Sequence, residues 1–128
     1  MRRVLVVDDD PSVVEVITVN LKADGYAVET AGDGEEAWDQ VLAAPPDLMV
    51  LDWMLPGRGG LELLVDMRRD ARTCRIPVVV LTAKARDEDV WAGWQAGVDR
   101  YLTKPFRVDE LLYYVGELLA ARDLEVAE

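Results

Sequence analysis

The sequence predicts an α/β protein with a flavodoxin-like (βα)5 fold, a three-layer sandwich built on a parallel five-stranded sheet. Short β-rich runs alternate with longer segments of helical periodicity, which is typical of repeated βα units. Several of the β-rich runs are almost entirely apolar, as strands buried on both faces must be. Turn and capping residues stand between the runs, so the boundaries of the elements are marked as well.

Five β-rich runs are the predicted strands. They are Val4–Val7, Tyr26–Thr30, Leu48–Leu51, Val78–Leu81 and Tyr101–Thr103. The first, third and fourth are nearly continuous apolar segments, so we expect them at the centre of the sheet. Right-handed crossovers leave the order 2-1-3-4-5 and the Rossmann orders as the main topologies. The order 2-1-3-4-5 is preferred because there are only five strands.

The five segments between and after the strands carry apolar residues at intervals of three and four, which gives each predicted helix one apolar face. These residues are Val13/Ile17/Leu21, Ala37/Val41, Leu61/Leu64/Val65, Val90/Trp94 and Leu111/Val115/Leu118. Asp10-Pro11 and Asp33-Gly34-Glu35-Glu36 have the form of helix starts, the second as a capping box. Gly25 and Gly97 stand where two of the helices are expected to end.

Composition excludes several classes of chemistry. The chain of 128 residues has no histidine and a single cysteine, Cys74, so an internal disulfide, a cysteine zinc cluster and an imidazole base are all excluded. With 14 basic and 25 acidic side chains, the net charge of −11 repels nucleic-acid phosphates and anionic membranes. We therefore expect no direct nucleic-acid binding by this domain, and hard cations are its natural ligands.

No targeting or spanning segment is expected. Met1-Arg2-Arg3 leads directly into the short apolar run Val4–Val7, which ends in acids rather than continuing as a signal-peptide core. The longest apolar run is also too short to cross a bilayer. The sequence thus predicts a cytoplasmic protein without membrane partners.

Polar side chains follow four of the predicted strands. Asp8 and Asp9 follow the first, Asp52 the third, Thr82 the fourth and Lys104 the fifth. In the order 2-1-3-4-5 these strands are adjacent, and the ligand crevice of such sheets lies beyond their carboxyl ends. Three carboxylates in one pocket repel each other unless a cation lies among them, and oxygen ligands favour Mg²⁺. The turn after the first strand lacks Gly-x-Gly-x-x-Gly, so a dinucleotide is not expected.

Asp52 has the central position, which suits a nucleophile that forms an acyl phosphate. Mg²⁺ and Lys104 would neutralise the transferring oxygens, and Thr82 would supply a hydrogen bond. Taken singly, each residue has a simpler explanation: the acidic run as a helix cap, Asp52 as a loop acid and Lys104-Pro105 as a turn. Their joint placement at adjacent strand ends favours a site, with Asp10 assigned to the cap.

Four motifs in this order resemble the receiver domain of two-component response regulators, most closely receivers that precede winged-helix DNA-binding outputs. The motifs are Val6-Val7-Asp8-Asp9-Asp10, Leu51-Asp52-Trp53-Met54-Leu55-Pro56-Gly57, Leu81-Thr82-Ala83 and Tyr101-Leu102-Thr103-Lys104-Pro105-Phe106. The resemblance covers residues 3 to about 120. It implies a receiver domain over residues 1–122, followed by a polar C-terminal tail over residues 123–128.

The resemblance also implies a function. A sensor histidine kinase would donate a phosphoryl group from a phosphohistidine to Asp52, with Lys104 as the phosphoryl clamp. The protein would be a switch rather than an enzyme, catalysing only its own phosphorylation and dephosphorylation. The Mg²⁺ ligands implied are Asp8, Asp9, Asp52 and the backbone carbonyl of Met54. A cis Lys104-Pro105 bond is implied as well.

The implied switch pair is Thr82 and Tyr101, which would change the surface of the fourth and fifth helices. On that surface we expect an apolar patch of Trp91, Trp94 and Tyr113, at which a second copy or an output partner docks, because aromatic side chains anchor interfaces. The alternative is that these three rings only fill the space between two helices. Receivers of this class commonly have an acid at position 100 and an arginine near 114, so their interfacial ion pairs are not expected here.

Two other functions stay open on the residues alone. An aspartyl-phosphate phosphohydrolase would need a second acid two residues after Asp52, where this chain has Met54. A docking module that has lost phosphorylation would lack an acid, Thr82 or Lys104, and all of them are present. Labelling with acetyl phosphate or phosphoramidate distinguishes the three functions. A receiver would take up one phosphoryl group per chain, a phosphohydrolase would turn the reagent over, and a docking module would not react.

Overall fold

A computed structural model describes residues 1–83 and 87–127 of the chain. Strands and helices alternate along it from the N-terminus. The strands are β1 (Arg3–Val7), β2 (Ala27–Ala31), β3 (Leu48–Asp52), β4 (Val78–Thr82) and β5 (Arg100–Thr103). The helices are α1 (Pro11–Ala23), α2 (Gly34–Ala43), α3 (Gly60–Arg69), α4 (Asp87–Ala96) and α5 (Val108–Ala127).

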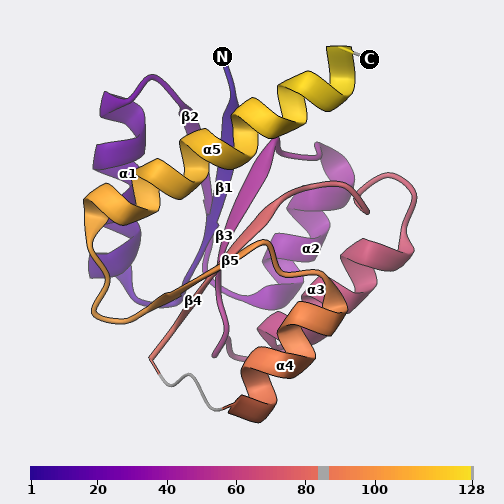
Figure 1. Cartoon of the computed structure of the whole chain (residues 1–128). Coiled ribbons are helices and arrows are strands. Elements are labelled where there is room, and N and C mark those ends of the chain that lie inside the picture. Colours follow the sequence, from indigo (N-terminus) through magenta and orange to yellow (C-terminus); the bar gives the residue numbers. More distant parts are fainter. Residues whose placement is uncertain (84–86, 128) are drawn as a thin grey trace.

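The strands form one parallel sheet in the order β2-β1-β3-β4-β5, which confirms the predicted topology. Helices α1 and α5 lie on one face of the sheet, and α2, α3 and α4 lie on the other (Figure 1). Successive residues of a strand point to opposite faces. In β1, Val4 and Val6 pack toward α1 and α5, whereas Leu5 and Val7 pack toward α2 and α3.

The helix starts follow the capping signals. The Asp10 carboxylate accepts a hydrogen bond of 2.9 Å from the Ser12 N–H, and Pro11 is the first residue of α1. At α2, Asp33 accepts from the Glu36 N–H at 2.8 Å. The Glu36 carboxylate accepts in return from Gly32, one residue before the cap, at 3.2 Å. Both starts therefore satisfy backbone donors that a helix leaves unpaired.

Two predicted apolar faces need correction. In α3, Leu61 is 37% exposed. A Cβ on Gly60 would lie 2.9 Å from the Trp53 ring, and this close packing turns Leu61 outward. The buried residues of α3 are Gly60, Leu63, Leu64 and Met67, of which only Leu64 belongs to the predicted face. In α5, Leu111 and Val115 are buried as predicted, but the third buried residue is Leu119 rather than Leu118, which is partly buried.

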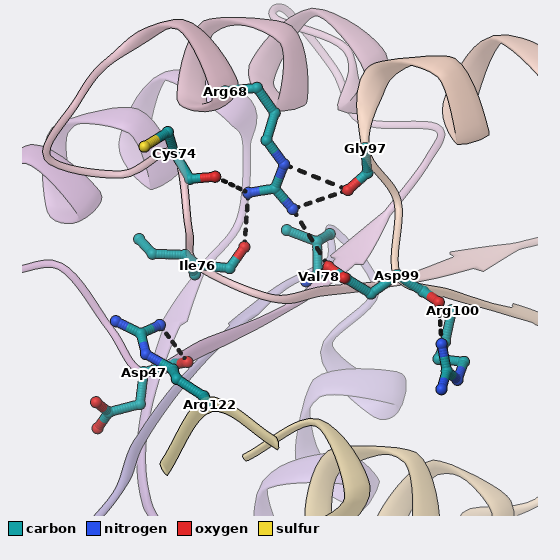
Figure 2. A network of polar contacts seen from close by, with 9 residues as sticks. All are labelled: Asp47, Arg68, Cys74, Ile76, Val78, Gly97, Asp99, Arg100 and Arg122. Carbon is teal, nitrogen blue, oxygen red and sulfur yellow. Dashed lines mark hydrogen bonds and ion pairs between the residues drawn. The ribbon is translucent and has the colours of Figure 1, made fainter. Parts of the chain in front are cut away.

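Helix α5 continues through the boundary expected at residue 122 and ends at Ala127, so the backbone of most of the expected tail is helical. The Arg122 guanidinium donates to the Asp47 carbonyl at 2.8 Å, which ties this part of α5 to the start of β3 (Figure 2). The division at residue 122 stays a prediction. Among the described residues, no helix combines the length and the apolar character that crossing a membrane requires.

Arg68 joins three segments beneath α4. Its guanidinium donates to the Gly97 carbonyl at 2.8 and 3.3 Å and to the carbonyls of Cys74 and Ile76 at 3.2 and 2.7 Å (Figure 2). It also contacts the Asp99 carboxylate at 3.2 Å. These bonds link the end of α3 to the approach to β4 and to the turn between α4 and β5, the strand that carries Tyr101.

Candidate functional site

The predicted site residues lie at the carboxyl edge of the sheet. Asp52 and Thr82 are the last residues of β3 and β4, and Asp8 directly follows β1. Backbone hydrogen bonds continue the strand pairing beyond these ends, from the Trp53 N–H to the Leu81 carbonyl at 2.9 Å and from the Lys104 N–H to the Thr82 carbonyl at 2.8 Å. The start of each loop is thereby held in register with the neighbouring strand.

Three carboxylates meet at this edge. One oxygen of each of Asp8, Asp9 and Asp52 lies within 4.8 Å of the others. Asp8 and Asp52 are 2% and 5% exposed, whereas Asp9 is exposed. Asp8 accepts from the Asp10 N–H at 2.9 Å, and Asp52 accepts from the Met54 N–H at 3.1 Å. The loops themselves thus orient the two buried carboxylates.

Lys104 supplies the positive charge in this cluster. Its Nζ donates to Asp8 Oδ2 at 2.8 Å and lies 3.6 Å from Asp52 Oδ2. The peptide bond that follows, Lys104-Pro105, is cis, as the family resemblance implied. The ammonium bridges two acids that belong to different strands, and it neutralises only one of the three carboxylate charges.

Burial raises the pKa of Asp52, since an ion is poorly solvated there. The Met54 N–H and Lys104 oppose this shift of the pKa, and Asp8 and Asp9 reinforce it by repulsion. For Lys104, burial lowers the pKa, but the hydrogen bond to Asp8 and the charges of Asp52 and Asp8 outweigh burial, so the pKa is raised. Lys104 therefore stays charged, and Asp52 is destabilised as an anion.

The donor set fits a hard divalent cation. Only oxygen ligands are available, two of the acids are buried, and repulsion already disfavours ionised Asp52. Carboxylates combined with backbone or water oxygens are the usual ligands of Mg²⁺. The Met54 N–H points to Asp52, and the ligand role of the Met54 carbonyl stays a prediction.

Thr82 and Tyr101 occupy neighbouring strands. Thr82 is 3% exposed at the end of β4. Tyr101 in β5 is half-buried, and its hydroxyl donates to the Val90 carbonyl of α4 at 3.3 Å. Its ring meets the Trp53 ring edge to face, with centroids 6.2 Å apart. Trp53, which directly follows Asp52, is a contact that sequence patterns did not single out.

An apolar groove adjoins the carboxylates, with a volume of about 310 Å³. It lies between α1 and the segment that follows β5, and Lys104 belongs to both the groove and the acidic cluster. Its lining residues are Ser12, Val13, Val16, Lys104, Pro105, Phe106 and Val108. Sequence patterns place the two valines on α1, but they do not show that residues 104–108 pack beside them.

The aromatic residues of α4 and α5 reach the surface. Trp91, Trp94 and Tyr113 are 66%, 47% and 66% exposed, so the alternative in which all three rings are core residues is wrong. Arg100, which stands where an acid is usual, pairs with Glu117 of α5 at 2.5 Å and lies 5.7 Å from the centre of the Tyr114 ring. Arg100 thus has partners within its own chain.

Comparisons with known proteins agree with this architecture. Residues 4–116 match the response regulator receiver domain family. The chain is 42% identical over 123 residues to the DNA-binding dual master transcriptional regulator RpaA of Synechocystis sp., covering 96% of this chain and 51% of RpaA. It is 41% identical over 127 residues to the DNA-binding response regulator MtrA of Mycobacterium tuberculosis, covering 99% and 54%. The chain spans about half the length of these relatives.

Solved structures show the same likeness. The receiver domain of the Francisella response regulator 1452 superimposes with a TM-score of 0.88 at 34% identity, over 95% of this chain and 99% of that one. A receiver domain protein from Methanospirillum hungatei superimposes with a TM-score of 0.92 at 28% identity, over 98% of each chain.

Proposed function

Because the chain belongs to the response regulator receiver domain family, we propose that it is a switch phosphorylated on Asp52 by the phosphohistidine of a sensor histidine kinase. The observation that carries this proposal is the position of the Asp52 carboxylate. It is buried, 3.6 Å from the Lys104 ammonium and grouped with Asp8 and Asp9. A carboxylate in such surroundings has a nucleophilic oxygen and the charges that a phosphoryl group needs.

In the proposed transfer, an Asp52 oxygen attacks phosphorus and forms an acyl phosphate. The phosphorus–nitrogen bond of the donor breaks, and the imidazole nitrogen keeps the electron pair. The Met54 N–H holds Oδ1 and orients the carboxylate. Lys104 and the Thr82 hydroxyl contact the oxygens of the transferred group. Asp8, Asp9, Asp52 and the Met54 carbonyl would hold Mg²⁺, which would add to the neutralisation of charge on these oxygens.

The groove beside Lys104 is suited to the donor protein. It is apolar, its lining residue Lys104 also contacts the carboxylates, and Val16 and Val19 on the adjoining helix are 45% and 60% exposed. An apolar helix of the kinase seated there would bring its phosphohistidine to Asp52. This contact orients the donor, since proximity is a large part of the rate of such transfers.

Phosphoramidate labelling tests the function. Purified chain with Mg²⁺ is expected to take up one phosphoryl group, detected by intact mass, and to lose it in hydroxylamine. Continuous release of phosphate far above one equivalent would show a phosphohydrolase instead. If the mass does not change and circular dichroism shows that the fold is intact, the chain is a docking module that is not phosphorylated.

Asp9→Ala is expected to weaken Mg²⁺ binding about tenfold or more, because it deletes a hard anionic ligand or the anchor of a bound water. The measurement is a metal titration followed by tryptophan fluorescence, since Trp53 directly follows Asp52. Asp10→Ala is the matched control: its side chain caps α1 at Ser12, so its loss costs helix stability rather than a ligand. Equal metal affinity in both variants would remove Asp9 from the site.

For the output, we propose that Thr82 and Tyr101 couple phosphorylation to the surface of α4 and α5, where a second copy or an output partner docks. The support is the placement of Thr82 beside Asp52 at the sheet edge and of Tyr101 between Trp53 and α4. A phosphoryl oxygen that draws the Thr82 hydroxyl toward it would alter the space available to Tyr101.

Phosphorylation is expected to raise self-association in sedimentation, and Trp94→Ala to abolish that rise without changing the labelling of Asp52. Trp94 is 47% exposed, and a large aromatic side chain contributes much of the energy of an interface. Val19→Ala removes exposed apolar surface from α1, which lies on the face of the sheet opposite α4, and should leave self-association unchanged. If phosphorylation leaves the wild type monomeric, the second copy is excluded and an output partner remains.

A further inference from the structure

Gly93, in the interior of α4, lies directly against the end of the Tyr101 side chain. A Cβ added to Gly93 would stand 1.5 Å from the Tyr101 hydroxyl oxygen and 2.8 Å from the adjoining ring carbon. Both distances are too short for non-bonded atoms. The present position of Tyr101 and a side chain at residue 93 therefore exclude each other.

In this position Tyr101 connects two tryptophans. Its ring is edge to face with Trp53, at a centroid distance of 6.2 Å, and with Trp94, at 5.2 Å. Trp53 directly follows Asp52 and is 9% exposed, whereas Trp94 is 47% exposed on α4. The three rings form a continuous path of contacts from the phosphoacceptor strand to the outer side of α4.

Glycine is otherwise a poor choice at this point of a helix, since it is among the weakest helix formers. Its φ carries no requirement for glycine either, because Gly93 is not among the glycines with positive φ, which in the described part of the chain are Gly25, Gly57 and Gly97. The absent side chain of Gly93 is thus explained by the Tyr101 hydroxyl that takes its place.

We propose that Gly93 is a positioning residue of the switch: it leaves open the seat on α4 that the Tyr101 side chain occupies here, and from which Tyr101 sets the orientation of Trp94. This inference rests on the proposed function, because the seat matters only if Tyr101 moves. Any side chain at residue 93 would leave phosphoryl chemistry at Asp52 intact and keep Tyr101 away from α4. The signal would then be lost between the phosphoryl group and the outer surface of α4.

A double-mutant cycle in the full chain tests the seat. Gly93→Ala is expected to lower the melting temperature when Tyr101 is present, because the new methyl group expels the ring. In a chain that also carries Tyr101→Ala, the same substitution is expected to lower it far less, because only Val98 Cγ2, at 3.2 Å, then crowds the methyl group and alanine is the better helix former. Gly116→Ala in α5, where a Cβ would meet only Tyr26 at 4.0 Å, should raise it in both backgrounds. If Gly93→Ala changes the melting temperature equally with and without Tyr101, the proposed contact between the two residues is refuted.

Fluorine NMR with 3-fluorotyrosine tests the role in switching, with Tyr101→Phe to assign the signal. In the wild type, adding beryllofluoride and Mg²⁺ is expected to shift the Tyr101 signal. In Gly93→Ala the signal should differ from the wild type before the addition and stay unchanged after it, while phosphoramidate labelling reaches one equivalent as in the wild type. A normal shift in Gly93→Ala would refute the inference. If the wild type itself cannot be labelled, the proposed function is refuted. The melting temperatures then still test the contact between Gly93 and Tyr101, because that measurement does not depend on phosphorylation.

Discussion

Asp52→Asn is expected to abolish phosphoryl uptake and, at neutral pH, to make the protein more stable. The uptake is lost because the amide has no anionic oxygen to attack phosphorus. The stability rises because Asp52 is a buried carboxylate beside two other acids, with its pKa raised chiefly by burial. Because folding raises the pKa of Asp52, this carboxyl group stabilises the native state below its unfolded pKa, and the contribution is lost as pH rises through the raised pKa.

The pH dependence separates this explanation from a packing effect. The stabilising effect of Asp52→Asn should be present at pH 7 and shrink as pH falls through the raised pKa of Asp52, because protonation relieves the same repulsion in the wild type. The stability difference is measured by thermal melts at several pH values. EDTA is present so that no divalent cation offsets the carboxylate charges. Asp10→Asn is the control, since asparagine caps helices as well as aspartate does. Hydroxylamine-sensitive labelling of the Asp52→Asn chain would contradict the assignment of the nucleophile.

Arg68→Met is expected to lower the free energy of unfolding by about 3 kcal/mol, the cost of breaking a partly buried ion pair and leaving three backbone carbonyls without their donor. Methionine keeps most of the apolar stem but leaves the carbonyls of Cys74, Ile76 and Gly97 without this donor. It also removes a cation from Asp99, whose carboxylate accepts from the Val78 N–H at 2.8 Å (Figure 2).

Urea denaturation measures the loss, with Arg69→Met as the matched control. Arg69 is the next residue of α3 and is exposed, so its substitution should change stability by no more than about 0.5 kcal/mol. Because Arg68 secures the turn that leads into β5, we also expect faster amide exchange at residues 97–99 in Arg68→Met. Similar stabilities of the two variants would mean that water replaces the guanidinium at little cost.

The sequence alone determined the fold class, the strand order and the edge at which the polar residues meet. Continuous apolar runs identify strands buried on both faces, and the period of each intervening segment identifies its helix. Asp8, Asp52, Thr82 and Lys104 could be assigned to one edge because parallel strands share the direction of their carboxyl ends. The exposure of Trp91 or Trp94 followed as well, since neighbours on one helix face do not all fit one small core.

Only the tertiary structure decided which contacts these residues make. That Lys104 donates to Asp8 at 2.8 Å rather than first to Asp52 depends on the path of the loop after β5. The exposure of Leu61 depends on how closely Gly60 packs against Trp53. The ring of Tyr101 lies over Gly93 because a strand and a helix of separate βα units happen to approach there. Periodicity records the face on which a side chain lies, whereas such contacts depend on distances between elements that no local pattern encodes.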